Sequence, residues 1–201
     1  DKIHHEIRID GNSITDADYY FNHVVPLITK VTGRNTKPVF RKDCQGIFIR
    51  FNAKEFAAFL RTTFEFPFGK KGDITIKKEA LGDFEKLKHV LRGLFDTDGS
   101  LYFTKNNSTV RSYPIIEISS HSPTLIKDLQ TALTRAGFTV KISHYQDSVK
   151  LHGKNNLFKW MQFIGTRHPD KASKFEFWKK HGYCPTIIEL PYKERLKLLG
   201  L

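Results

Sequence analysis

The most constraining feature of this chain is that its two halves present the same order of predicted elements. In both halves, alternating apolar and polar residues indicate strands, and periodic apolar segments that end near glycine indicate helices. The second half gives a strand pair at 101–104 and 115–119, a helix over 124–136, strands over 139–145 and 148–152, and a helix over 155–164. The first half gives a strand over 3–9, a helix over 16–32, a strand pair at 37–42 and 46–51, and a helix over 54–62. This duplication predicts an α/β (α+β) fold with two related subdomains.

The two halves also correspond in short stretches of sequence. The triplet 49–51, Ile-Arg-Phe, corresponds to 149–151, Val-Lys-Leu, and the triplet 7–9, Ile-Arg-Ile, corresponds to 116–118, Ile-Glu-Ile. On this alignment, the counterpart of the second half's first helix would lie before Asp1. We therefore expect the first repeat to lack that helix and most of its first strand, whether the N-terminus is truncated, processed or supplied separately.

The helix predicted over 84–97 ends in a feature that a purely structural helix would avoid. Asp96 and Asp98 lie at its C-terminal end, immediately before Gly99 and a predicted strand. Because that end of a helix carries partial negative charge, each acid there costs a few tenths of a kcal/mol or more unless a cation compensates. A divalent metal would compensate, and a solvated helix end with a glycine cap is the alternative. Gly93, which costs ~1 kcal/mol relative to alanine within a helix, indicates a close helix–helix contact.

The segment 91–99, Leu-Arg-Gly-Leu-Phe-Asp-Thr-Asp-Gly, resembles the signature of the LAGLIDADG homing endonucleases, with Arg92, Phe95 and Thr97 departing from the eponymous letters. The segment 66–72, Phe-Pro-Phe-Gly-Lys-Lys-Gly, resembles the linker of two-repeat members. The resemblance implies two pseudo-twofold-related αββαββα repeats with saddle-shaped antiparallel sheets, the first lacking its N-terminal helix. The predicted domains are an incomplete first repeat over 1–64, a linker over 65–83, a second repeat over 84–165 and a helical extension over 166–201, with helices at 169–181 and 191–199.

The resemblance implies a site-specific double-stranded DNA homing endonuclease that uses Mg²⁺ to hydrolyse phosphodiester bonds and is associated with a mobile intron. Asp98 is then the metal-binding acid and the Thr97 carbonyl a second oxygen ligand, while Asp96 is a helix-end or interface group. Leu91, Gly93 and Leu94 would face a partner helix. That helix, from the missing N-terminal segment or a second subunit, would bring a second acid and cover an apolar stripe along 87–94.

Basic residues near the scissile phosphates would stabilise the charge that develops in the transition state. Lys150 and Arg50 occupy equivalent positions in the two repeats, where each points away from its apolar neighbours. Both are candidate catalytic residues. Solvated strand residues are the alternative, because alternation determines the face of the sheet but not the distance to a substrate.

The polar faces of the predicted strand pairs suit the major groove of duplex DNA, where every base pair presents a distinct pattern of donors and acceptors. The candidate DNA-binding residues are Tyr102, Thr104, Asn106, Ser108, Arg111, Tyr113, Glu117, Lys141, Ser143 and Tyr145 in the second half, and Arg8, Arg41 and Lys42 in the first. Lys70 and Lys71 in the linker are candidates for phosphate contacts, which add affinity without sequence information. An ordinary solvent-facing sheet is the alternative.

Composition agrees with a polyanionic partner. The 201-residue chain carries 33 Lys plus Arg against 21 Asp plus Glu, a net charge of +12 that is spread along its length. Cys44 and Cys184 lack zinc-ligand spacing, and no apolar run approaches the ~20 residues that span a bilayer. We expect an intracellular protein, cytoplasmic in a prokaryote or organellar in a eukaryote. A nuclease-inactive DNA-binding relative, an intron RNA maturase and a generic basic nucleic-acid module are the alternative functions.

Overall fold

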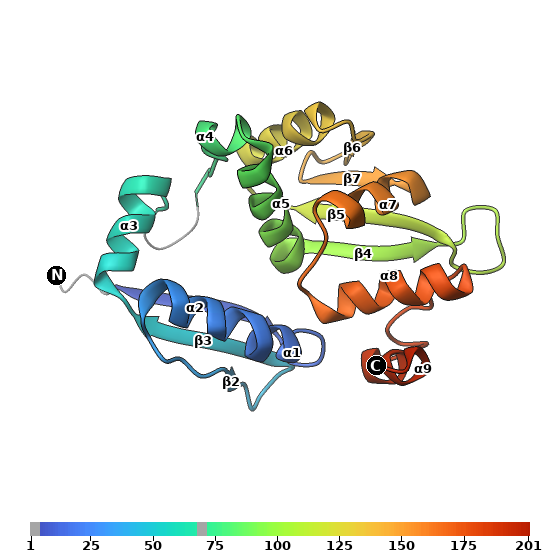
Figure 1. Cartoon of the computed structure of the whole chain (residues 1–201), viewed down its shortest axis with the longest axis horizontal. Helices are drawn as coiled ribbons and strands as arrows, with labels where there is room; N and C mark the ends of the chain where they lie inside the picture. Colours follow the sequence, from blue (N-terminus) through green and yellow to red (C-terminus); the bar gives the residue numbers. More distant parts are fainter. Residues whose placement is uncertain (1–4, 68–71) are drawn as a thin grey trace. The chain divides into compact units, whose positions relative to one another are not determined.

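A computed structural model describes residues 5–67 and 72–201 of the chain, which divides into two compact units, Asp1–Gly72 and Asp73–Leu201 (Figure 1). The boundary lies inside the segment 65–83 that was predicted to connect the repeats. Lys70 and Lys71 lie outside the described residues. Among the described residues, no helix combines the length and apolar character needed to cross a membrane.

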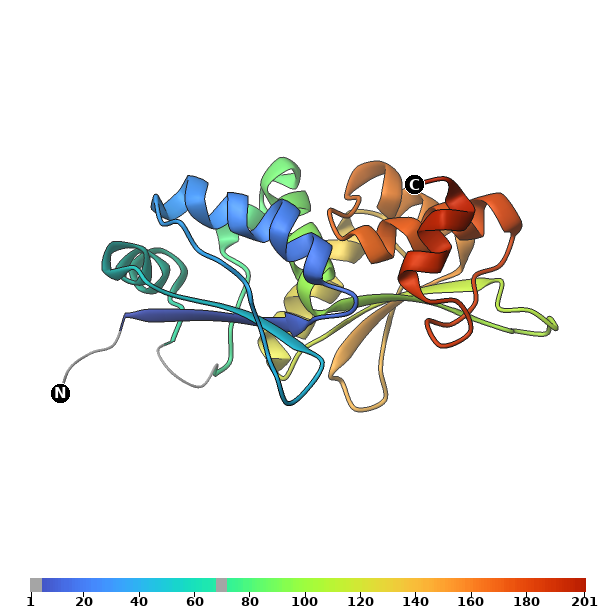
Figure 2. The same cartoon turned by 90° about the horizontal axis from the view of Figure 1, so that it is seen from below.

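Unit 1 is an antiparallel sheet covered by helices on one face (Figure 2). Its elements are β1 (Glu6–Asn12), α1 (Ala17–Tyr19), η1 (Tyr20–Val24), α2 (Val25–Thr32), β2 (Val39–Phe40), β3 (Gly46–Asn52) and α3 (Lys54–Phe64). The helix predicted over 16–32 is confirmed as consecutive α, π and α segments, and it ends at Gly33, whose φ of 68° favours glycine. The strands alternate so that Ile47, Ile49 and Phe51 enter a core with residues of these helices.

Unit 2 contains a complete set of repeat elements followed by two further helices. In chain order, the elements of unit 2 are α4 (Lys78–Leu81), α5 (Phe84–Asp98), β4 (Gly99–Thr104), β5 (Tyr113–Ser119), α6 (Pro123–Arg135), β6 (Val140–Ile142), β7 (Ser148–His152), α7 (Gly153–Phe163), α8 (Pro169–His181) and α9 (Tyr192–Leu199). The strand predicted over 139–145 is shorter than expected. Residues 143–147 turn back, because Ser143 Oγ donates to Asp147 Oδ1 and the Ser143 N–H donates to the Ser148 carbonyl.

The strand order confirms that the two units are related. Unit 1 has the order β1-β3-β2 and unit 2 the order β4-β5-β7-β6, so β1, β3 and β2 correspond to β5, β7 and β6. The register agrees as well, since Arg8 lies opposite Arg50 in unit 1 and Glu117 lies opposite Lys150 in unit 2. Within the described residues, unit 1 has no counterpart of α5 and β4, as the sequence comparison predicted.

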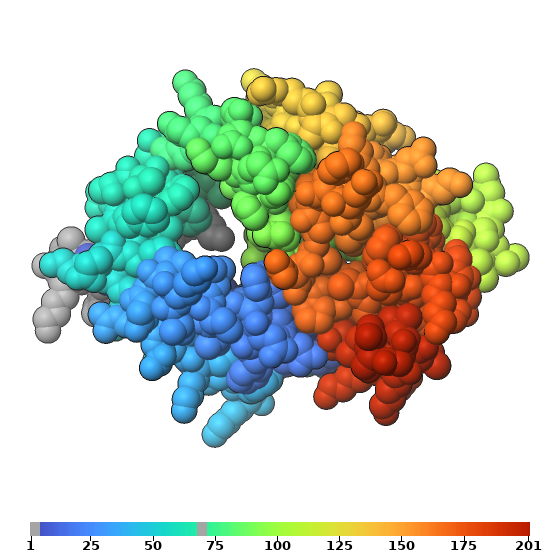
Figure 3. All heavy atoms as spheres, viewed as in Figure 1, coloured from blue at the N-terminus to red at the C-terminus, as the bar shows by residue number. Residues whose placement is uncertain are grey.

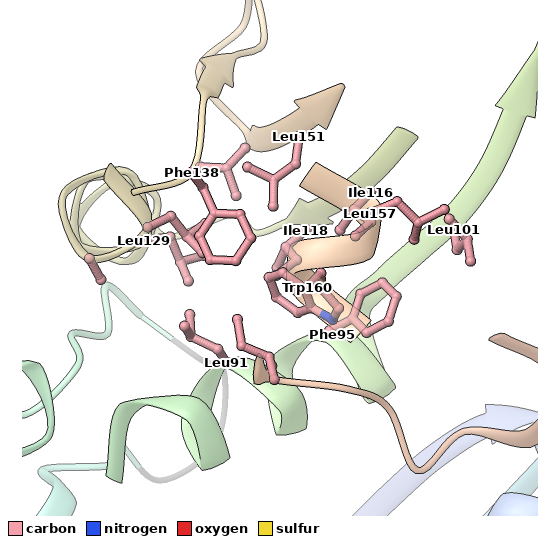
Figure 4. Packing of buried hydrophobic residues seen from close by; sticks show 14 of the residues in the cluster. Leu91, Phe95, Leu101, Ile116, Ile118, Leu129, Phe138, Leu151, Leu157 and Trp160 are labelled. Atoms are coloured by element: carbon pink, nitrogen blue, oxygen red, sulfur yellow. The ribbon is translucent and has the colours of Figure 1, made fainter. Parts of the chain in front are cut away.

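The core of unit 2 forms where α5, α6 and α7 cover the inner face of the sheet. Figure 4 shows Leu91 and Phe95 of α5 beside Trp160 of α7, with Leu129 of α6 and Leu151 of β7 completing the cluster. Leu91 and Trp160 are completely buried, and the Phe95 and Trp160 rings meet edge to face at 5.0 Å. The inner face of α5 therefore packs on its own unit.

This packing corrects part of the predicted interface stripe. Leu87 and Leu91 are buried in the core of unit 2, so they are not available to a partner helix. Leu94 and Val90 are partly buried, and Gly93 is exposed. A methyl group added at Gly93 would meet no atom within 4 Å in the part of the chain that the structure describes. The stripe is therefore narrower than predicted, because a helix that packs on its own sheet must turn one apolar face inward.

The end of the predicted linker belongs to unit 2. The Asp73 carboxylate accepts hydrogen bonds from the Ser122 and Thr124 hydroxyls, and the Ile76 N–H donates to Asp128 Oδ2 at 2.9 Å. Ile76 is also buried in the core. Residues 73–76 are thus fixed along the start of α6 before the chain enters α4 and α5.

The C-terminal helices lie on the helical side of unit 2 (Figure 2), and their orange and red atoms cover part of the surface of this unit in Figure 3. The Trp178 ring of α8 stacks on Phe103 of β4, and its Nε1 donates to the Ser112 carbonyl at 2.7 Å. Arg195 of α9 is fully buried and pairs with Asp170 of α8. This extension is therefore part of the unit's core.

Candidate active site and nucleic-acid interface

The site is built around the last turn of α5. Asp83 begins the helix by accepting the N–H groups of Glu85 and Lys86. Its end is fixed by Gly99, whose N–H donates to the Leu94 and Phe95 carbonyls. A Cβ at Gly99 would lie 2.6 Å from the Phe95 carbonyl oxygen, so this close approach requires glycine. The Asp-Gly sequence therefore places an acid immediately before a helix-to-strand junction.

Asp98, the predicted metal ligand, is exposed at this junction. The Thr97 hydroxyl lies 3.0 Å from the Gly93 carbonyl and 3.1 Å from Asp98 Oδ2. No group of three His, Cys, Asp or Glu side chains within the described residues is placed to hold a metal ion. Asp98 can thus supply one carboxylate ligand, and the rest of a coordination sphere would come from other groups.

Asp96 has a different environment from Asp98, although the sequence separates them by one residue. Its side chain is buried, accepting the Thr166 hydroxyl at Oδ1 and the Arg167 N–H at Oδ2, 2.9 Å away. The buried Lys171 ammonium of α8 donates to the Phe95 carbonyl and to the Asp96 carbonyl at 2.8 Å. The cation expected at this helix end is therefore present as a lysine.

The candidate catalytic residue Lys150 belongs to a polar network on the outer face of the sheet. Its ammonium lies 3.1 Å from Glu117, which also accepts the Tyr102 hydroxyl at 2.9 Å and the Ser148 hydroxyl at 2.7 Å. Burial raises the pKa of Glu117, but the hydrogen bonds from Ser148, Tyr102 and Lys150 outweigh it and hold that pKa below its usual value. Three protein donors engage Glu117, so it positions Lys150 and Tyr102.

Positive charge extends across the outer face beyond Lys150. Lys141 of β6 lies directly opposite Lys150 in the sheet register, so both side chains emerge on the same face. The neighbouring His152 has a lowered pKa because of burial and the positive charges of Lys141 and Lys150. This face therefore carries two ammonium groups, of which Lys150 is paired with Glu117.

The outer face of unit 1 carries a cluster of arginines. Asp10 bridges Arg8 and Arg41, each 2.8 Å from its Oδ1, and both guanidinium groups lie over the Phe48 ring. The hydrogen bond from Arg8, supported by Arg41, lowers the pKa of Asp10. Arg50 is more exposed and lies 3.6 Å from Glu6. Asp10 thus holds Arg8 and Arg41 in fixed orientations on the surface.

The remaining predicted DNA contacts have different environments. Exposed or half-exposed positions are occupied by Thr104, Asn106, Ser108, Tyr113, Lys42, Ser143 and Tyr145. Arg111 also has protein partners, because its Nε lies 3.6 Å from Glu189 and its carbonyl accepts the Cys184 N–H. It connects the β4–β5 loop to the C-terminal segment.

Two participants were missed by the sequence analysis. Lys171 lies 75 residues from Asp96 in the chain, and the sequence contains no local signal for this contact. Phe48 and Arg50 are two residues apart in β3, so strand alternation predicts that both lie on the outer face. Alternation does not predict that the Phe48 ring lies beneath the arginines.

Comparison with known proteins confirms the resemblance. Residues 85–162 match the family described as the LAGLIDADG-like domain. No curated protein sequence matches the chain.

Among solved structures, a complex of I-DmoI with DNA and Ca is similar at a TM-score of 0.55, with 14% identity over 85% of this chain and 82% of that chain. The I-LtrWI LAGLIDADG homing endonuclease bound to target DNA has a TM-score of 0.51, with 10% identity over 96% of this chain and 84% of that chain. A K262A mutant of I-SmaMI has a TM-score of 0.54, with 9% identity over 97% of this chain and 84% of that chain. These similarities confirm the predicted fold.

Proposed function

We propose that this chain, whose residues 85–162 form a LAGLIDADG-like domain within the fold of that endonuclease family, is a site-specific double-stranded DNA endonuclease associated with a mobile intron. The observation that carries the proposal is the position of Asp98. Asp98 is exposed at the end of the family's signature helix. Two residues later the chain reaches the outer face of the sheet, which also carries Lys150.

The register of the sheet supports a common site for Asp98 and Lys150. Ser100 lies opposite Glu117, Glu117 opposite Lys150, and Lys150 opposite Lys141, so these residues form one row across the strands. Neighbouring strands are roughly 5 Å apart, which places a phosphate bound near the start of β4 within about two strand spacings of Lys150. Its ammonium would stabilise the charge that develops on that phosphate.

A divalent metal fits this site, because Asp98 and the phosphates of bound DNA would both serve as its ligands. Mg²⁺ is bound through one or two carboxylates together with substrate phosphates, and Asp98 with the Thr97 carbonyl would hold it here. When bound, the metal would activate water and stabilise the leaving oxygen of the phosphodiester. Asp98 would hold the ion at the junction that Gly99 fixes.

A second acid belongs to the proposal, because hydrolysis of both strands needs a site for each. We place it on a helix equivalent to α5, contributed by an N-terminal segment or by a second copy of the chain. Gly93, exposed and without a neighbour within 4 Å among the described residues, allows another helix to approach closely. Leu94 is partly buried and lies beside it on α5.

The outer faces of both sheets would provide DNA recognition. The fixed guanidinium groups of Arg8 and Arg41 suit the acceptors of guanine in the major groove. Lys141 and Lys150 suit phosphates, and Tyr113 and Thr104 add donors along β5 and β4. In this arrangement the unit 1 arginines supply sequence discrimination and the unit 2 lysines supply affinity.

The first prediction tests Asp98. A duplex library with a randomised segment would identify the bound sequence, and cleavage of that duplex would then be measured in Mg²⁺. We expect Asp98→Asn to abolish cleavage while binding in Ca²⁺ stays equal or becomes tighter, because the neutral amide binds metal poorly and repels phosphate less. Glu194→Gln, an exposed acid on α9, is the control and should cleave normally.

Two outcomes would contradict this proposal in different ways. Cleavage by Asp98→Asn at the normal rate would remove the metal role of Asp98. Specific binding without cleavage by the unmodified protein would favour the alternative of a nuclease-inactive DNA-binding relative or intron RNA maturase.

A further inference from the structure

The last turn of α5 is held by residues from the start of the C-terminal extension. A helix leaves its final carbonyl groups without intrahelical partners, and this helix adds two acids at that end with no basic residue in its own last turn. Figure 1 shows the chain leaving α7 and passing the end of α5 before it enters α8. This connecting segment contains the groups that satisfy the Asp96 side chain, and the first turn of α8 supplies Lys171, which satisfies the carbonyls.

Lys171 is the central contact. The residue is only 7% exposed, and a buried ammonium requires polar partners. It donates to the Phe95 and Asp96 carbonyls and lies 4.9 Å from the centre of the Phe95 ring. The two peptide groups that Lys171 fixes directly precede the segment from Thr97 to Gly99.

The Asp96 side chain provides a second contact that holds the end of α5. Its two carboxylate oxygens accept the Thr166 hydroxyl and the Arg167 N–H, so this acid is directed away from the junction. Asp98, two residues later, is left exposed. The two acids of the motif are thereby separated into one that fixes the backbone and one that is presented outward.

The helix that carries Lys171 is itself rigidly placed. Asp170, the preceding residue, pairs with the fully buried Arg195, which also donates to the Ser173 hydroxyl at 3.1 Å. At the other end of α8, Trp178 is buried in the core of unit 2. Lys171 therefore presents its ammonium from a support that is fixed at both ends.

We propose that Lys171 is a positioning residue, which fixes the last turn of α5 so that Asp98 is oriented to bind a divalent metal. The inference rests on the proposed function of Asp98, and it assigns the C-terminal extension a part in the site. Lys171 acts through the carbonyls of Phe95 and Asp96.

The test compares Lys171→Met with the control Lys179→Met. The Lys179 ammonium, like that of Lys171, lies over an aromatic ring, but this ring is Phe175 of α8 itself and not a ring of α5. Amide hydrogen exchange and Mn²⁺-induced broadening of the Gly99 amide signal are measured by NMR without DNA. Loss of charge-assisted hydrogen bonds should make the amides of 97–99 exchange about tenfold faster or more in Lys171→Met. Mn²⁺ should then broaden Gly99 only at several-fold higher concentration, and Lys171→Arg should restore much of the response.

Lys179→Met should match the unmodified protein in both measurements. Unchanged exchange at 97–99 and an unchanged Mn²⁺ response in folded Lys171→Met would overturn the proposal. If Lys171→Met does not fold, Thr166→Val, which removes one donor to Asp96, should show the same changes to a smaller extent, and their absence would count against the proposal equally. A failure of Mn²⁺ to affect Gly99 in the unmodified protein would show that Asp98 does not hold the ion before DNA binds, which overturns the metal-orienting part of the inference, while faster exchange in Lys171→Met would still show that Lys171 fixes the end of α5.

Discussion

At the scale of single residues, Glu117 shows how a predicted surface acid acquires a structural role. Its carboxylate joins Tyr102 of β4, Ser148 of β7 and the ammonium of Lys150. Its pKa lies below the ordinary value of 4.5 in the folded state, so the folded protein binds a proton there less readily than the unfolded chain. The stability that ionised Glu117 contributes is therefore full above about pH 4.5 and is lost as the pH falls through the lowered pKa.

We predict that Glu117→Gln lowers the stability of unit 2 by ~1 kcal/mol at neutral pH, and that the difference from the unmodified protein shrinks as the pH falls below the ordinary glutamate range. Urea unfolding can be followed by tryptophan fluorescence, since both tryptophans, Trp160 and Trp178, belong to this unit. Glu176→Gln is the control, because Glu176 and Lys179 form an exposed pair in the same unit that should contribute little. A difference that stays constant down to the acid limit would contradict the network.

At the scale of elements, α5 has two faces with different tasks. One face is the core of unit 2, where Leu91 and Phe95 are completely buried. The other carries Gly93, which no described atom approaches closely enough to exclude a methyl group. The sequence could not distinguish these faces, because its apolar residues at 84, 87, 90, 91, 94 and 95 extend around the helix.

We predict opposite effects of Gly93→Ala on stability and on activity. The variant should stabilise unit 2 by ~1 kcal/mol, since alanine favours helix and meets no obstacle there. It should reduce DNA cleavage if another helix packs against this position, as we propose. Gly99→Ala is the matched variant and should destabilise the unit, because its Cβ would lie 2.6 Å from the Phe95 carbonyl. Unchanged cleavage and self-association in Gly93→Ala would exclude a close helix contact at Gly93.

At the scale of the whole molecule, the net charge of +12 predicts how binding depends on salt. Each phosphate contact on duplex DNA should contribute about −0.9 to the slope of log K against log salt. Lys141→Ala should reduce the magnitude of that slope by about one, whereas Lys179→Ala on α8 should not change it. Fluorescence anisotropy across a salt series measures both. A flat slope, or tighter binding to single strands than to duplex, would remove the proposed DNA interface.

The sequence by itself determined the order of helices and strands, the correspondence of Arg50 with Lys150, and the position of Asp98 at a helix end. These features follow from local periodicity and from glycine and proline at element boundaries, which act over a few residues. Only the tertiary structure decided that Leu91 belongs to the core, that Glu117 holds Lys150, and that Lys171 compensates the end of α5. Those contacts join residues as far as 76 positions apart in the chain, where packing between elements determines the partner and no local pattern records it.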